Sequence, residues 1–161
     1  MIEPPADLLN SLVQAHGGTA FIQALGAEVI EAAAGRIKMR LPYSQKIVGN
    51  PDTGVVHGGV ITGLLDHGCG MAVGSGLGVI VGANQERRAG TSYATLDLRI
   101  DYLKAAKPNA DIFVMAECVK ITRQIVFARG RAYQDNEDDI IASATGTFML
   151  TEMRATANVK A

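Results

Sequence analysis

The chain has 161 residues, of which 48% are hydrophobic and 19% are charged, and its formal net charge is −1 at pH 7. A chain of this length can bury a core without disulfide bonds or metal ions, so we expect one domain spanning residues 1–161. The near-neutral charge argues against a protein that binds nucleic acid or an anionic membrane, because such proteins carry a basic excess.

Cysteine usage and the absence of targeting signals indicate the compartment. Two cysteines, Cys69 and Cys118, are too few for a disulfide framework or a zinc site. No basic segment of the kind that opens a secretory signal is visible at the start. The longest uncharged run, residues 68–85, is too short and too rich in glycine for a membrane span. We therefore expect a soluble, cytoplasmic protein with reduced thiols.

The first part of the chain predicts two short helices and a pair of strands. Residues 6–16 place leucine and valine at helical spacing, and a second helical segment covers 19–25. Residues 36–41 alternate between apolar and basic side chains, which is typical of a half-solvated strand. Residues 28–34 should pair with that strand through a turn at Gly35.

A glycine-rich helix is expected next, over residues 58–73, with residues 74–78 fraying its end. Four strands follow, separated by turn-like residues, at 95–103, 111–120, 125–133 and 140–150. A run of strands joined by short links forms an antiparallel sheet, and a single helix then lies on one face of it. The predicted class is therefore α+β.

The strand at 95–103 alternates between an apolar set and a polar set of side chains. The two sets are, in that order, Leu96, Leu98, Ile100, Tyr102 and Thr95, Asp97, Arg99, Asp101. Alternation of this kind is typical of a half-solvated strand, and alternating solvated charges explain Asp97, Arg99 and Asp101.

The helix at 58–73 carries a carboxylate in an unusual setting. On a helical wheel its apolar residues form a stripe that should be buried, made of Ile61, Leu64, Leu65, Cys69 and Ala72. Asp66 lies off that stripe, and Gly63 and Gly70 are among its neighbours on the helix surface. Glycine in a helix costs about 1 kcal/mol relative to alanine, and aspartate is also a poor mid-helix residue. Either the glycines pack against a sheet beside a solvated aspartate, or they clear the helix face for a ligand.

The approach to this helix adds a second feature with functional meaning. His57, Gly58 and Gly59 lead the chain into the helix start, where backbone N–H groups are unpaired and the dipole is positive. Glycine at this point lets a carbonyl oxygen approach those donors. A polarised carbonyl group and a carboxylate two turns further along the helix are two parts of a hydrolytic site.

The order of Asn50, then His57-Gly58-Gly59, then Asp66 resembles the signature of the PaaI-like acyl-CoA thioesterases, which have the hot-dog fold. The resemblance covers most of residues 27–150. It includes the strand after the central helix, a turn of the form K-x-G-R and the last strand, at 95–106, 120–123 and 142–148. It implies an antiparallel sheet wrapped around one long helix, with a short N-terminal helix and a domain core at about 27–151.

The resemblance also implies a reaction, which is hydrolysis of an acyl-CoA thioester to a free acid and CoA. Asp66 matches the catalytic carboxylate, as general base or as nucleophile, and the Gly58 N–H matches the donor that polarises the carbonyl. Asn50 matches a residue that holds the thioester or the attacking water. Thr95 matches one that positions the water, and His57 one that organises the helix start. No metal and no cofactor are implied, since CoA is part of the substrate.

In this family the site lies between two subunits, so a homodimer is implied as the minimum, and a homotetramer arises by pairing of dimers. Gly59 is a further expected substrate contact. Arg123, Lys104 and Arg88 are candidates for binding the CoA phosphates, with a solvated surface charge as the alternative for each. Thr122 stands where the K-x-G-R turn has glycine, which leaves the role of Arg123 open.

Two other functions fit a hot-dog domain: a hydratase or dehydratase, and a non-catalytic protein that binds acyl-CoA. A nucleophilic role for Cys69 is disfavoured because this residue falls on the apolar stripe. The spacing of His57, Asp66 and His67 matches no zinc pattern. The preferred acyl group, and the choice between CoA and acyl carrier protein, stay open.

Overall fold

The computed structural model describes residues 19–77 and 91–152. The predicted helix at 6–16 and the candidate phosphate-binding residue Arg88 lie outside these residues. The extent of the single domain therefore stays a prediction. In chain order the elements are α2 (Ala20–Leu25), β1 (Glu28–Ala33), β2 (Arg36–Leu41), the 3-10 helix η1 (Gln45–Ile47), β3 (Val48–Asn50), β4 (Val55–Val56), α3 (Gly58–Gly76), β5 (Thr91–Tyr102), β6 (Ile112–Ile121), β7 (Ile125–Tyr133) and β8 (Ala142–Glu152).

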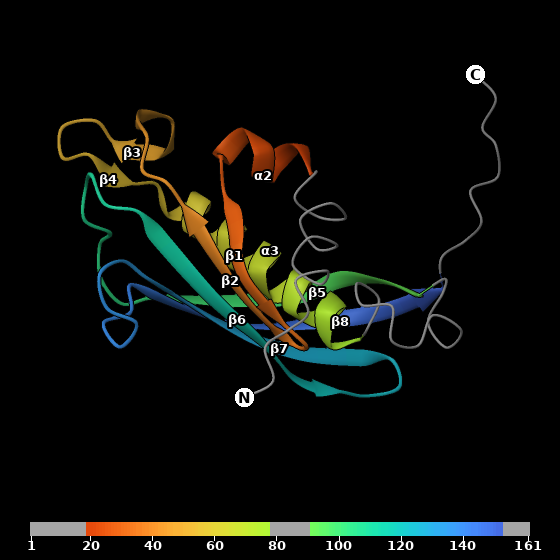
Figure 1. The fold of residues 1–161 in the computed structure, drawn as a ribbon. Helices are drawn as coiled ribbons and strands as arrows, with labels where there is room; N and C mark the ends of the chain where they lie inside the picture. The colour runs from red at the N-terminus through yellow and green to blue at the C-terminus, as the bar shows by residue number, and fades with distance from the viewer. Residues whose placement is uncertain (1–18, 78–90, 153–161) are drawn as a thin grey trace, which may run out of the picture.

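Six strands form one antiparallel sheet in the order β1-β2-β6-β7-β8-β5. The sheet curves around α3, which lies along one of its faces (Figure 1). This confirms the α+β class and the single central helix. The short β3–β4 hairpin was not predicted, since that segment reads as a loop; β5 also begins four residues earlier than expected, at Thr91.

The core lies between α3 and the sheet, mainly against β2, β6 and β7. The predicted apolar stripe of the helix is confirmed, because its members are at most 3% exposed: Ile61, Leu64, Leu65, Cys69 and Ala72. Within residues 19–77 and 91–152, no helix combines the length and the apolarity that crossing a membrane requires.

The end of α3 differs from the prediction, because the helix continues to Gly76 instead of fraying. The hydroxyl of Ser75 is buried and accepts a hydrogen bond from the Gly35 N–H at 3.0 Å. A Cβ on Gly76 would lie 3.1 Å from the Cβ of Cys118 and 3.3 Å from the Cα of Gly35. These small residues therefore let the last helical turn pack against the β1–β2 turn.

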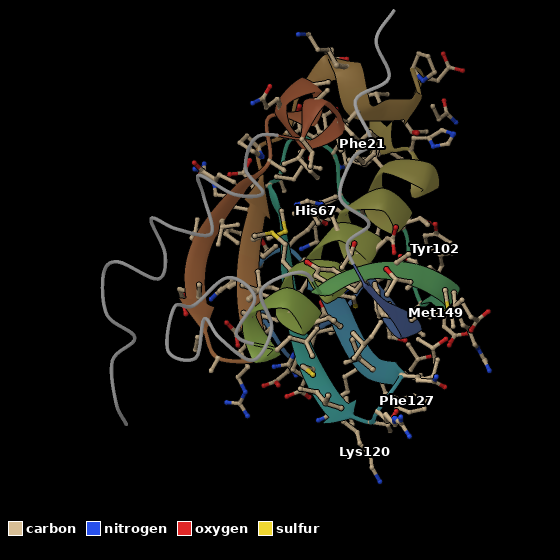
Figure 2. The ribbon with its side chains drawn as sticks, turned by 90° about the vertical axis from the view of Figure 1, so that its right-hand side faces the viewer. Phe21, His67, Tyr102, Lys120, Phe127 and Met149 are labelled. Atoms are coloured by element: carbon tan, nitrogen blue, oxygen red, sulfur yellow. The ribbon has the colours of Figure 1, made fainter. Side chains whose placement is uncertain are left out.

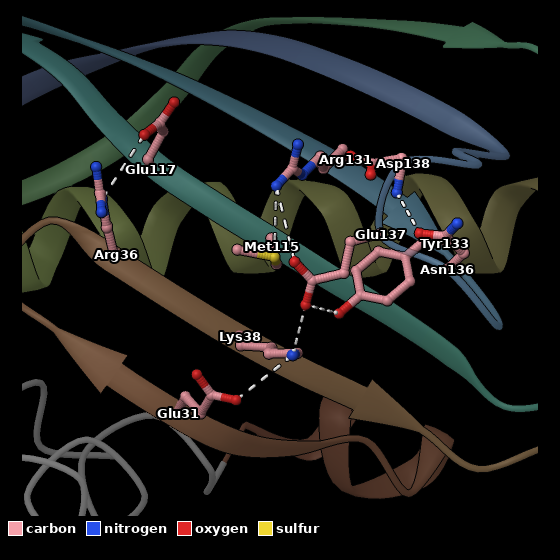
Figure 3. A network of polar contacts seen from close by, with 10 residues as sticks. All are labelled: Glu31, Arg36, Lys38, Met115, Glu117, Arg131, Tyr133, Asn136, Glu137 and Asp138. Atoms are coloured by element: carbon pink, nitrogen blue, oxygen red, sulfur yellow. Dashed lines mark hydrogen bonds and ion pairs between the residues drawn. The ribbon is translucent and has the colours of Figure 1, made fainter.

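The sheet face opposite α3 carries a network of polar contacts (Figure 3). Glu137, in the β7–β8 loop, accepts hydrogen bonds from Lys38 of β2 at 2.8 Å and from the hydroxyl of Tyr133 at 3.0 Å. Lys38 Nζ also lies 3.4 Å from a carboxylate oxygen of Glu31 in β1. The hydrogen bond between Lys38 and Glu137 raises the pKa of the lysine and lowers the pKa of the glutamate. The network joins the loop to the β1–β2 edge of the sheet.

Candidate active site

The helix α3 begins at a histidine cap. His57 has an extended backbone, with φ −64° and ψ 129°, and its Nδ1 accepts a hydrogen bond from the Gly59 N–H at 2.9 Å. Since Nδ1 is an acceptor, the proton of the neutral ring is on Nε2. The Gly59 N–H is thus used inside the protein. The Gly58 N–H, in contrast, has no acceptor among the described residues.

Tyr102, the last residue of β5, packs on this first helical turn. Its hydroxyl donates a hydrogen bond to the carbonyl of Gly58 at 2.7 Å and lies 2.5 Å from Oγ1 of Thr62. A Cβ on Gly58 would be 3.2 Å from the phenol oxygen, so the ring occupies the space of a side chain there. Figure 2 shows Tyr102 beside α3. Sequence reasoning missed this contact, because the alternation of β5 identifies the face that carries Tyr102 and not what lies opposite.

Asp66 lies in the middle of α3 and faces β5. Oγ1 of Thr95 donates to Oδ1 of Asp66 at 2.9 Å, so the structure brings these two predicted site residues together. Thr95 is exposed, but it does not share the sheet face of Asp97, as unbroken alternation along the strand would require. A β-bulge shifts the register between Thr95 and Asp97, so that Thr95 pairs with the buried Phe148 while Asp97 pairs with Thr147. The bulge turns Thr95 toward α3.

The glycines beside Asp66 do not form an open strip, as one interpretation of the sequence had it. A Cβ on Gly63 would lie 2.7 Å from Cζ of Phe21, so a ring from α2 covers this position. At Gly70 the nearest atoms to such a Cβ are aromatic carbons at 3.7 Å, which is ordinary contact. Phe21 keeps 53% of its surface exposed and lies beside α3 in Figure 2. Close packing therefore explains Gly63.

Asn50 lies in the hairpin that leads into the helix. Its Oδ1 accepts the Asp52 N–H at 3.0 Å, which stabilises the turn between β3 and β4. The hairpin is held against the helix start, because the His57 N–H donates to the carbonyl of Ile47 at 2.9 Å. Among the described residues no hydrogen bond joins Asn50 to Asp66.

Within the described ranges, Arg123 and Lys104, two of the basic residues suggested for the CoA phosphates, form no hydrogen bond or ion pair with Asp66, Thr95 or Gly58. Arg123 is exposed in the turn between β6 and β7. Thr122 closes that turn in place of the expected glycine, because its hydroxyl donates to the Ile125 carbonyl at 2.6 Å and accepts the Ile125 N–H at 3.0 Å. Lys104 forms an ion pair with Asp139, and the lysine lowers the pKa of the Asp139 carboxyl.

Cys69 is not placed to act as a nucleophile. The residue is fully buried, and burial, with a smaller contribution from the charge of Asp66, raises the pKa of its thiol to about 12. Since the thiolate is the reactive form, this thiol is inert at neutral pH. In the described part of the chain, no three His, Cys, Asp or Glu side chains come together in a group that could hold a metal ion.

Comparison with known proteins identifies the family. The model of the thioesterase superfamily matches residues 53–141, which is more than half of the chain. The chain belongs to the thioesterase superfamily. YigI of Salmonella typhimurium, a medium/long-chain acyl-CoA thioesterase, is 31% identical over 134 residues, which cover 81% of this chain and 84% of that protein. A Pseudomonas aeruginosa protein of solved structure is 42% identical, with a TM-score of 0.72, over 88% of this chain and 98% of that one.

The predicted hot-dog fold of this thioesterase is confirmed by the same comparisons. A Haemophilus influenzae thioesterase supports the fold alone, with 19% identity and a TM-score of 0.74 over 93% of this chain and 94% of that one. The predicted enzyme class, a thioester hydrolase, is confirmed as well. The match to the superfamily includes His57, Asp66 and Thr95. The hydratase and the non-catalytic binding protein find no support here.

Proposed function

We propose that this thioesterase hydrolyses an acyl-CoA to a free acid and CoA, with Asp66 as the general base or the nucleophile. The observation that carries the proposal is the hydrogen bond from Thr95, which orients the Asp66 carboxylate on the face of α3 that meets β5. Thr95 binds Oδ1 and leaves Oδ2 to meet water or substrate. The choice of acyl-CoA is supported by the Salmonella typhimurium relative, whose substrates are medium- and long-chain acyl-CoAs.

The start of α3 would polarise the thioester. The Gly58 N–H donates to the carbonyl oxygen, and the positive end of the helix dipole stabilises the negative charge that develops there. As a base, Asp66 takes a proton from a water molecule whose oxygen attacks the carbonyl carbon. The C–S bond then breaks, and the proton passes to the departing sulfur. As a nucleophile, Asp66 displaces the thiolate and forms an anhydride, which water hydrolyses.

This arrangement needs two copies of the chain. Gly58 and Asp66 are eight positions apart on one helix, which corresponds to about 12 Å. The N–H groups at a helix start also point away from the helix body, so an oxygen bound there lies further still from Asp66. We therefore propose a homodimer in which Gly58 of one copy acts with Asp66 of the other, and a homotetramer formed from two such dimers.

The strand β5 offers a surface for this pairing. It is 12 residues long, lies at the edge of the sheet, and has one side without a strand partner among the described residues. Leu96 and Tyr102, both on β5, are 53% and 51% exposed. Two β5 strands that pair across a dimer would satisfy the open backbone groups and cover such side chains.

Thiol release from a panel of acyl-CoAs tests the reaction. The panel holds short-chain, medium-chain, long-chain and aromatic acyl groups, so it also identifies the acyl preference, and an acyl carrier protein thioester tests the carrier. We expect turnover by the native protein and a loss of at least about 100-fold in kcat for Asp66→Asn. Turnover of no acyl-CoA by the native protein, or full activity of Asp66→Asn, overturns the proposal.

A matched pair of variants tests the Gly58 N–H. Gly58→Pro removes this donor, and it suits the backbone because proline is favoured at the first helical position after an extended residue such as His57. Gly58→Ala is the control, because it brings the same Cβ against Tyr102 and keeps the N–H. We expect the proline variant to lose at least about tenfold more in kcat than the alanine variant. Equal losses would show that the donor is not used.

Mixed dimers test the shared site. In a dimer of one Gly58→Pro chain and one Asp66→Asn chain, one site receives both substitutions and the other receives neither. Co-expression of the two impaired variants should therefore give a higher activity than either homodimer has. If the mixed protein stays as inactive as its parents, Gly58 and Asp66 do not act across two chains.

A further inference from the structure

We propose that Tyr102 is a positioning residue, which holds the first turn of α3 in the geometry that the Gly58 N–H needs. The inference rests on the proposed function of that turn. It starts from two hydrogen bonds of the Tyr102 hydroxyl, one to the carbonyl of Gly58 at 2.7 Å and one to Oγ1 of Thr62 at 2.5 Å.

The direction of these bonds follows from the number of protons. The tyrosine hydroxyl carries one proton, and the Gly58 carbonyl can only accept. Tyr102 therefore donates to Gly58, and Thr62 must donate to Tyr102. The result is a chain of two hydroxyl groups that ends on the helix start, in which each bond polarises the next.

The first turn needs such support because Gly58 and Gly59 have no side chains that restrict their backbone. The peptide group between them is held at both ends. Its N–H donates to Nδ1 of His57 at 2.9 Å, and its carbonyl accepts from Tyr102. The phenol ring also lies where a Cβ of Gly58 would be. With this peptide fixed, the adjoining His57–Gly58 peptide, which carries the proposed donor, points in one direction before substrate binds.

Core packing does not account for this contact. Within one chain, Tyr102 keeps 51% of its surface exposed, although its hydroxyl bonds residues that lie 44 and 40 positions away in the sequence. A ring that lies outside the core of its own chain and reaches the helix start through its polar end fits a role in shaping that start. It contrasts with Tyr93 at the other end of β5, whose ring is packed against Phe148 with centroids 6.4 Å apart.

Tyr102→Phe is the central test, because it keeps the ring over Gly58 and removes the hydroxyl. We expect kcat to fall about five- to tenfold with KM changed by less than about twofold. Thr62→Val should lower kcat by less than Tyr102→Phe does. Thr62→Ser, which keeps the hydroxyl, should retain the native kcat. Tyr133→Phe is the matched control, because it removes a hydroxyl that bonds Glu137 on the opposite face of the sheet. Equal kcat values for Tyr102→Phe and Tyr133→Phe overturn the inference.

A double variant tests whether Tyr102 acts through the Gly58 N–H. In a Gly58→Pro background that donor is absent, so Tyr102→Phe should cause no further loss of kcat. A full additional five- to tenfold loss would show that Tyr102 acts by another route, and overturns the inference.

Amide hydrogen exchange separates this inference from the proposed reaction. We expect the Gly59 amide, which is hydrogen-bonded to His57, to exchange faster in Tyr102→Phe than in the native protein, and at the native rate in Tyr133→Phe. Unchanged exchange in Tyr102→Phe overturns the inference whatever the activity. If exchange responds as expected but the native protein hydrolyses no acyl-CoA, the proposed function fails and the hold of Tyr102 on the helix start is supported.

Discussion

Thr95 and Asp66 meet between β5 and α3, with 2.9 Å between Oγ1 and Oδ1, because β5 contains a bulge. With regular alternation, Thr95 would share the face of Asp97 and point away from the helix. The extra residue, Leu96, changes the side of the sheet on which Thr95 lies. Bulges near active sites commonly redirect a side chain in this way. A one-residue irregularity of the strand thus brings Thr95 of β5 to Asp66 of α3.

The Thr95 hydroxyl should matter to the rate. Thr95→Val keeps the shape of the side chain and removes the hydrogen bond that orients Asp66, so we expect kcat to fall about tenfold. Thr95→Ser keeps the hydroxyl and should retain most of the activity. Steady-state thiol release from the best acyl-CoA of the panel measures both. Equal kcat values for the two variants would show that Asp66 does not depend on this bond.

The cap at His57 should contribute to stability. His57→Ala removes the acceptor of the Gly59 N–H and should lower the free energy of unfolding by about 1 kcal/mol. His57→Asn supplies another side-chain acceptor at the same backbone position and should recover most of that loss. Urea unfolding of the three proteins at one pH measures the difference. The cap has no energetic role if the alanine and asparagine variants are equally destabilised.

Gly63 and Gly70 form a natural pair for a packing experiment. Gly70→Ala should raise the free energy of unfolding by up to about 1 kcal/mol, because alanine favours the helix and the new Cβ has room. Gly63→Ala should lack this gain, because its Cβ must displace the ring of Phe21. In a Phe21→Ala background the gain should appear at position 63 as well. Thermal unfolding of these variants measures the gain in stability. Equal gains at positions 63 and 70 in the native background would contradict the conclusion that the Phe21 ring covers Gly63.

Asp111 should make the fold sensitive to acid. The Tyr43 N–H donates to it at 2.9 Å, Arg40 lies 2.7 Å from it, and both hold the pKa of the Asp111 carboxyl below its ordinary value of 3.8. A carboxyl with a depressed native pKa stabilises the fold above the ordinary value, and this contribution is lost as the pH falls through the depressed pKa. The Asp111→Asn variant should therefore have a lower free energy of unfolding than the native protein at pH 7. As the pH falls below 3.8, its free energy of unfolding should decrease less steeply than that of the native protein. Urea unfolding between neutral and acidic pH measures these free energies. If they change with pH in parallel for the two proteins, Asp111 is not the cause of the acid sensitivity.

Local patterns in the sequence were sufficient for the order of α3 and the six strands of the main sheet, the buried stripe of α3 and the helix start after His57. These features depend on residues within a few positions of one another. The features that were missed depend on contacts between distant segments. Ser75 keeps the helix going by bonding Gly35, which lies 40 positions away, and Tyr102 bonds Gly58 across 44 positions. The spacing of residues within one helix or strand does not predict a hydrogen-bond partner in a distant segment.

The composition of α3 also has a consequence for folding kinetics. Seven of its 19 residues are glycine, and each costs about 1 kcal/mol of helix propensity relative to alanine. A peptide of residues 58–76 should therefore be a random coil in water, by circular dichroism. The segment becomes helical only when side chains such as Val114 and Cys118 of β6 pack against its glycines. The central helix cannot act as an early local nucleus, so folding must wait for contacts between distant strands and should be slow for a chain of this size.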